Sequence, residues 1–73
     1  MVSQTVLHQA AQRTGFRVQL VSAPVEIIAG RHREGQSLAQ ITHYLRTHLG
    51  PENPVASRCF VEWVISAIGG ERR

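Results

Sequence analysis

The candidates for metal ligation or catalysis in this sequence are one thiol, four imidazoles and the carboxylates of the five glutamates. The thiol and the imidazoles belong to Cys59, His8, His32, His43 and His48. A structural zinc ion needs four such ligands, which usually come in closely spaced pairs. His43 and His48 are five residues apart, whereas residues that share one face of a helix are three or four apart. The spacing therefore predicts no metal site, and nothing else in the sequence indicates a cofactor.

Cys59 and a distant histidine have the residue types of a catalytic nucleophile and its base. Such a pair also needs donors that stabilise an oxyanion, and the sequence contains no glycine-rich loop that would supply them. Cys59 lies among Phe60, Trp63 and Val64, so we expect it to be a buried apolar side chain. We therefore expect no catalytic residue and no enzymatic activity.

The charged residues are of two types only. All eight basic residues are arginines, all five acidic residues are glutamates, and the net charge is +3. Guanidinium groups form forked hydrogen bonds with carboxylates and phosphates. The charge therefore favours an acidic partner, either a protein or a nucleic acid. The residues that we expect to bind it are Arg13, Arg17, Arg31, His32, Arg33, Arg46 and Arg58.

The length of 73 residues allows one domain, near the lower limit for a self-sufficient core. No apolar run approaches the roughly 20 residues of a membrane-spanning helix, and the N-terminus does not resemble a signal peptide. We therefore expect a cytoplasmic protein that makes no membrane contact. The expected organisation is a mobile or weakly helical arm at 1–14, a helical domain at 15–70 and a frayed tail at 71–73.

Residues 37–49 carry the clearest helix signal. Ser37 and Gln40 form a capping box, and apolar residues then recur at helical spacing until Gly50. A second helix is predicted over 54–68, where Asn53 and Pro54 provide a favoured start. Gly69 and Gly70 are expected to close it. Two helices joined by a four-residue turn at 50–53 have the outline of a helix-turn-helix unit.

The segment before these helices is ambiguous. Residues 16–21 alternate between apolar and polar, which indicates a short strand. Residues 24–33 fit either a helix capped by Ser22 or a second strand, and we favour the helix because basic residues occur late in it. The expected fold class is mainly α: a small three-helix, helix-turn-helix-like domain with a loose N-terminal arm, in which a strand at 16–21 remains open. The predicted core consists of Phe16, Val25, Ile28, Leu38, Ile41, Leu45, Leu49, Phe60, Trp63, Val64 and Ile68.

Three features carry a resemblance to a known family: the weakly patterned segment Met1–Thr14, the arginine-rich stretch Arg31–Glu34 and the helical remainder. In these the chain resembles the small phage-encoded regulators of bacterial RNA polymerase. The resemblance implies a protein in the host cytoplasm that binds the N-terminal part of the polymerase's largest subunit, near the RNA exit channel. There it would inhibit initiation and oppose termination. It implies no individual contact residue.

Two functions therefore remain: a transcription regulator that docks on RNA polymerase, and a helix-turn-helix regulator that contacts DNA or RNA directly. A recognition helix presents polar and basic side chains near its N-terminus to the bases. Residues 54–68 offer only Arg58, and Glu62 would face the phosphates, so we favour docking on the polymerase. The same helix is apolar over most of its circumference, which also leaves self-association open, with Trp63 as an anchor.

Overall fold

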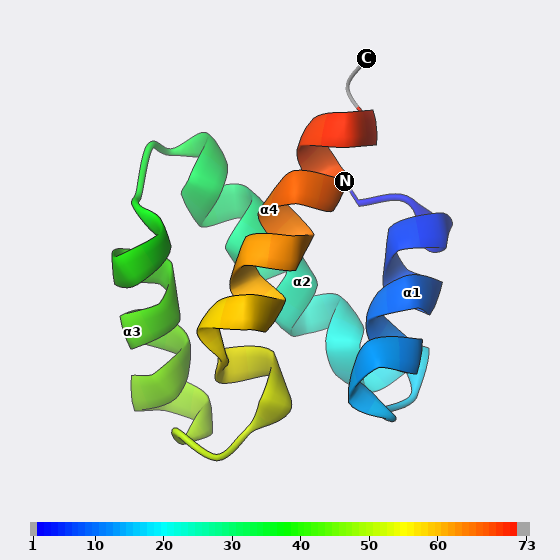
Figure 1. Ribbon diagram of the computed structural model, residues 1–73, viewed down its shortest axis with the longest axis horizontal. Helices are drawn as coiled ribbons and strands as arrows, with labels where there is room; N and C mark the ends of the chain where they lie inside the picture. Colours follow the sequence, from blue (N-terminus) through cyan, green and yellow to red (C-terminus); the bar gives the residue numbers. More distant parts are fainter. Residues whose placement is uncertain (1, 72–73) are drawn as a thin grey trace.

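Four α-helices and one turn of 3₁₀ helix form the computed structural model (Figure 1), which describes residues 2–71 and, of Glu71, the backbone alone. The elements are α1 (Gln4–Thr14), α2 (Val18–Arg33), α3 (Leu38–Leu49), η1 (Pro54–Ala56) and α4 (Arg58–Glu71). The described residues include no strand. The mainly α class is confirmed, with four helices where three were predicted. None of the described helices combines the length and the apolar character needed to cross a bilayer.

α4 is the central helix of the fold. It packs against α1, α2 and α3, and it crosses in front of α2 with α1 and α3 on its two sides (Figure 1). The Cα atoms extend over 30 × 28 × 17 Å, and their radius of gyration is 11.0 Å. A folded chain of this length is expected to have a radius of about 11 Å. The helices therefore share one core rather than forming separate units.

Every helix contributes to this core. Its buried apolar residues are Val2, Val6, Leu7, Ala10, Val21, Val25, Ile28, Ala29, Ile41, Leu45, Val55, Ala56, Phe60, Val61 and Val64. Most of the predicted core residues lie in it or against it. Leu49 was wrongly included, because it is the last residue of α3 and its side chain is 41% exposed. The prediction also missed Val21, Val55 and Val61.

The N-terminal segment, predicted as a mobile or weakly helical arm, is a helix docked on the rest of the fold. The side chain of Ser3 accepts the N–H of Val6 at 3.3 Å, and Gly15 ends α1 with φ +77°. Val6 and Leu7 are buried. A helix of this length is marginal in isolation, so packing against α2 and α4 stabilises it. The core therefore extends across the expected boundary between an arm at 1–14 and a domain at 15–70.

The strand predicted at 16–21 is wrong, since α2 begins at Val18. Val18, Val21 and Val25 follow the three- and four-residue spacing of a helix face, which a short alternating window conceals. Leu20 is 62% exposed. Residues 24–33 are helical, as favoured, but the helix begins before Ser22. Pro24 thus lies inside α2, where it lacks the N–H that would bond to the carbonyl of Leu20.

The connection between α3 and α4 is longer than the predicted turn at 50–53. That turn leads into η1, where Asn53 accepts the N–H of Val55 at 3.0 Å. α4 begins only at Arg58, because the hydroxyl of Ser57 accepts the N–H of Phe60 at 3.1 Å, as an N-cap does. α3 and α4 run side by side in opposite directions (Figure 1). The connection over residues 50–57 is also longer than the three- or four-residue turn of a helix-turn-helix unit.

α4 departs from the prediction in two further respects. Cys59 is exposed, because the buried face of α4 is formed by Phe60, Val61 and Val64. Gly69 and Gly70 lie inside the helix, which continues to Glu71. Of the tail predicted at 71–73, the backbone of the first residue is helical, and residues 72–73 lie outside the described residues.

Candidate interface around α4

The structure distributes the seven predicted partner-binding residues over separate places. Arg31, His32 and Arg33 form the last turn of α2, where positive charge stabilises the helix end. Arg17 precedes the same helix at its other end. Arg46 and Arg58 come together between α3 and α4. Arg13 lies against Trp63 between α1 and α4.

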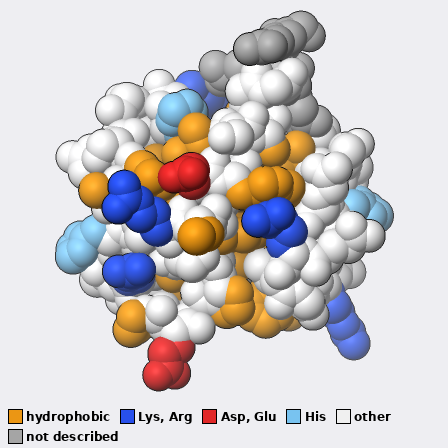
Figure 2. All heavy atoms as spheres, viewed as in Figure 1, with side chains coloured by type: hydrophobic (Ala, Val, Ile, Leu, Met, Phe, Trp, Pro, Cys, Tyr) orange, Lys and Arg blue, Asp and Glu red, His pale blue; other side chains and the backbone are white. Residues whose placement is uncertain are grey.

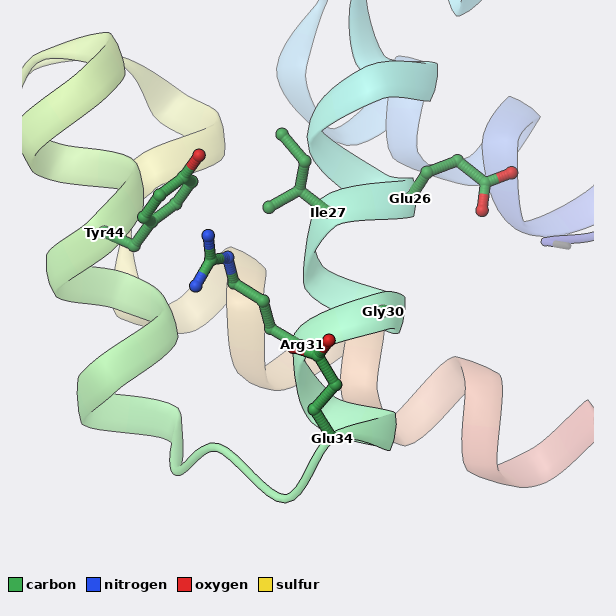
Figure 3. Close-up of a pocket in the computed structure, with 6 residues that line it drawn as sticks. All are labelled: Glu26, Ile27, Gly30, Arg31, Glu34 and Tyr44. Atoms are coloured by element: carbon green, nitrogen blue, oxygen red, sulfur yellow. The ribbon is translucent and has the colours of Figure 1, made fainter.

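Arg31 is used within the fold. Its guanidinium carbon lies 3.5 Å from the centre of the Tyr44 ring, and its Nη1 donates to Oε1 of Gln36 at 3.3 Å. Figure 3 shows the side chain reaching from α2 to Tyr44 on α3. Stacking of a guanidinium on an aromatic face is attractive, more so when the pair is partly desolvated, as the half-buried Arg31 is. Arg31 therefore holds α2 against α3.

The hollow beside Arg31 has a mixed charge. It measures about 240 Å³ and is also lined by Glu26, Glu34 and Tyr44. Glu26 points away from Tyr44, toward α1 (Figure 3), where its Oε2 accepts the N–H of Val2 at 3.4 Å. Arg31 and Glu26 thus bond within the chain, and Glu34 adds a negative charge to the lining, which makes this hollow a poor candidate for an anionic partner.

The hollow between α3 and α4 has a different lining. It measures about 200 Å³ and is lined by Ala39, Thr42, His43, Arg46 and Arg58. Three of these side chains carry or can carry positive charge, and none is acidic. No ion pair within residues 2–70 joins an arginine to a glutamate. Both guanidinium groups are therefore free to bind an external anion.

Both helices fix the shape of this hollow. The residues that α3 supplies lie at helical positions i, i+3, i+4 and i+7, so they form one strip along the helix. Thr42 is only 6% exposed, and its hydroxyl donates to the carbonyl of Leu38 at 2.8 Å. On α4, the cap by Ser57 makes Arg58 the first helical residue. Its side chain thus starts at the helix N-terminus, where the macrodipole also favours an anion.

A second hollow lies on the other side of α4. It measures about 370 Å³ and is lined by Gln9, Gln12, Arg13 and Trp63. The guanidinium carbon of Arg13 lies 4.9 Å from the centre of the Trp63 ring. Trp63 is half-buried and also contacts Phe60, with ring centres 6.0 Å apart. The sequence indicated Trp63 as an anchor, but nothing in its spacing predicted the pairing with Arg13.

The two hollows and the exposed strip of α4 between them form one surface. We call it the α4 face and define it by its residues: Arg13, His43, Arg46, Arg58, Cys59, Glu62 and Trp63. Figure 2 shows arginine and hydrophobic side chains close together on this side of the molecule. Cys59 and Glu62 are exposed on α4 itself. Cys59 was not predicted on this surface, because its apolar sequence neighbours indicated a buried side chain.

The α4 face offers chemical groups that are suited to binding a partner. Guanidinium groups donate to carboxylate or phosphate oxygens, and the Trp63 ring offers apolar area. Among the described residues, no three histidine, cysteine or glutamate side chains gather into a possible metal site. His43 is exposed beside the arginines and adds a third nitrogen donor.

No protein-family model matches the chain, and neither does any curated protein or solved structure.

Proposed function

We propose that the chain is a non-enzymatic regulator of transcription that binds bacterial RNA polymerase through the α4 face, in the bacterial cytoplasm. One observation carries the proposal: Arg13 lies against the half-buried Trp63 on one side of α4, and Arg46 and Arg58 line a hollow on its other side. None of the three is paired with a glutamate within residues 2–70. Tryptophan and arginine are among the residues most enriched in binding hot spots between proteins. The net charge of +3 favours an acidic partner surface.

The identification of the partner as RNA polymerase rests on the sequence resemblance. The phage-encoded regulators that the chain resembles bind the largest subunit of the enzyme. The α4 face supports a protein partner of acidic character, and the resemblance supplies its identity. Binding of an acidic protein and the identity of that protein are therefore separate claims, because a different acidic protein would fit the same face.

A direct DNA-reading role has less support. α4 would be the recognition helix, yet Phe60, Val61 and Val64 are buried and the helix packs against the other three. Its exposed strip offers one cation, Arg58, and one anion, Glu62. A recognition helix presents donors to base edges and avoids negative charge near phosphates. One observation does favour nucleic acid as the second candidate: the cationic hollow with Arg46 and Arg58 also suits a backbone phosphate.

Affinity capture from a bacterial lysate tests the proposal. The full chain, immobilised and treated with or without nuclease, should retain RNA polymerase subunits in both cases, and purified polymerase should bind directly. Arg46→Gln with Arg58→Gln should reduce this capture. Arg17→Gln with Arg33→Gln removes the same charge away from the α4 face and should leave it near the parent level. Nuclease-sensitive retention, or equal loss in both double variants, would contradict docking through the α4 face.

A further inference from the structure

The hollow between α3 and α4 has the lining of an anion-binding site, and its volume of about 200 Å³ leaves room for one anionic group. Arg46 reaches it from α3 and Arg58 from α4, while His43 lies one turn before Arg46. Like charges brought together on two helices repel each other when nothing lies between them. An anion bound there would remove this repulsion and accept hydrogen bonds from both guanidinium groups. The lining is therefore more favourable with a ligand than without one.

Ala39 keeps the hollow open. It lies seven residues before Arg46 on the same strip of α3, and its side chain is a single methyl group. A longer side chain at this position would project into the space that an incoming group needs. Ala39 is exposed, so the core does not require a small residue there.

We propose that this hollow binds the carboxylate of an acidic side chain on a protein partner, with Arg46 and Arg58 as the principal donors and His43 as a further one. The inference rests on the proposed function for the class of the partner, and it names the chemical group that the α4 face recognises. The partner group is a glutamate or aspartate that projects from its surface far enough to enter the hollow.

The neighbouring charges favour a carboxylate over a nucleic-acid phosphate. Glu62 is exposed on α4 one turn after Arg58, between the two hollows that flank this helix. A duplex carries closely spaced phosphates, so a strand bound at Arg58 would bring others near Glu62. Separate acidic groups on a folded partner can instead be placed opposite each arginine, with a basic or polar group opposite Glu62.

A titration of the full chain with a tetraglutamate peptide, blocked at both ends and at fixed ionic strength, tests the site. The NMR signals of the Arg46 and Arg58 side-chain Nε–H groups should shift and saturate together. Arg46→Gln or Arg58→Gln should each weaken the peptide's affinity by roughly tenfold, as expected for a hydrogen bond to a charged group. Absence of these shifts, or unchanged affinity in both variants, would overturn the proposal.

Two variants of α3 separate occupation of the hollow from the effect of net charge. Ala39→Glu places a carboxylate of the chain itself in the hollow, and it should abolish peptide binding. Gln40→Glu adds the same charge one residue away, and Glu still completes the capping box. It should bind the peptide like the parent. Equal loss of binding in both variants would mean that only net charge matters and would contradict a specific site.

A short DNA duplex, titrated under the same conditions, decides the chemical group. Weaker shifts than those caused by the peptide support the carboxylate, and tighter duplex binding that depends on Arg46 and Arg58 overturns it in favour of phosphate.

The lysate capture distinguishes the carboxylate site from the proposed function. If the parent and Ala39→Glu retain polymerase equally, the carboxylate site fails while docking stands. If the parent retains none while the peptide binds at the hollow, the polymerase assignment fails and the site stands.

Discussion

At the scale of single residues, the arginines of this chain do different things although their side chains are identical. Arg31 stacks on Tyr44 and bonds to Gln36, so its guanidinium is used within the fold. Arg46 and Arg58 face a hollow that contains no acidic side chain. The difference comes from the neighbours that the fold supplies. The sequence contains the arginines but does not say which of them already have a partner.

Arg31→Ala should therefore lower the stability of the fold rather than remove a binding contact. We expect a loss of about 1–2 kcal/mol in the free energy of unfolding, because the stacked, half-buried guanidinium and its hydrogen bond are both removed. Urea denaturation measures the change. The matched control is Arg33→Ala, an exposed residue of the same helix turn, which should stay within about 0.5 kcal/mol of the parent. Equal stabilities of the two variants would contradict the structural role of Arg31.

Cys59 gives the second prediction at this scale. Its thiol is exposed on the α4 face, so a maleimide should label it fully without denaturant. The label should leave the melting temperature nearly unchanged, since the side chain lies outside the core. It should also block capture of polymerase, because it occupies the strip between the two hollows. Labelling that requires urea would show that Cys59 is buried, as its sequence neighbours suggested.

At the scale of the elements, helix caps, in which a side chain bonds to nearby backbone, gave a correct prediction for α3. The capping box of Ser37 and Gln40 is present, with bonds of 2.8 and 3.2 Å, and α3 has the predicted extent. The start of the last helix, predicted at Pro54 after an Asn53 cap, is wrong, because a second capping residue, Ser57, follows four residues later. Asn53 caps η1 and Ser57 caps α4. The choice between them depends on the packing of Val55 and Ala56 into the core, which no local pattern expresses.

Two glycines at the end of α2 should respond oppositely to substitution. Gly30 lies inside the helix, and a Cβ there would meet nothing within 4 Å. Gly30→Ala should raise the free energy of unfolding by roughly 0.5–1 kcal/mol, because alanine costs less backbone entropy in a helix. Gly35 has φ +94°, so Gly35→Ala should destabilise by about 1 kcal/mol. Thermal melts of both variants check the prediction, and a shift of the same sign in both would contradict it.

At the scale of the whole molecule, the helical class and much of the core follow from the spacing of apolar residues. Ile41 and Leu45 were placed correctly because α3 has one regular apolar face. α1 and α2 were harder to predict. α1 is polar on average, and α2 contains Pro24, which usually marks a helix start although here it lies inside the helix on its buried face. For the candidate site, the arginine types were predictable, but the meeting of Arg46 with Arg58 was not. That meeting depends on how α3 and α4 pair, which is a tertiary property.

α1 shares one hydrophobic core with α2 and α4. Leu7 of α1 is buried beside residues of α2 and α4, so removal of its side chain should leave a cavity in the shared core. Leu7→Ala should lower the free energy of unfolding by about 2–5 kcal/mol. His8→Ala, which changes an exposed residue of the same helix, should have an effect within about 0.5 kcal/mol. Circular dichroism and Trp63 fluorescence should report one transition in the parent, because all four helices contact each other through α4 or α2. If Leu7→Ala melted like the parent, residues 1–14 would behave as an arm that the core does not need, and the α1 side of the α4 face, with Arg13 against Trp63, would lose its structural basis.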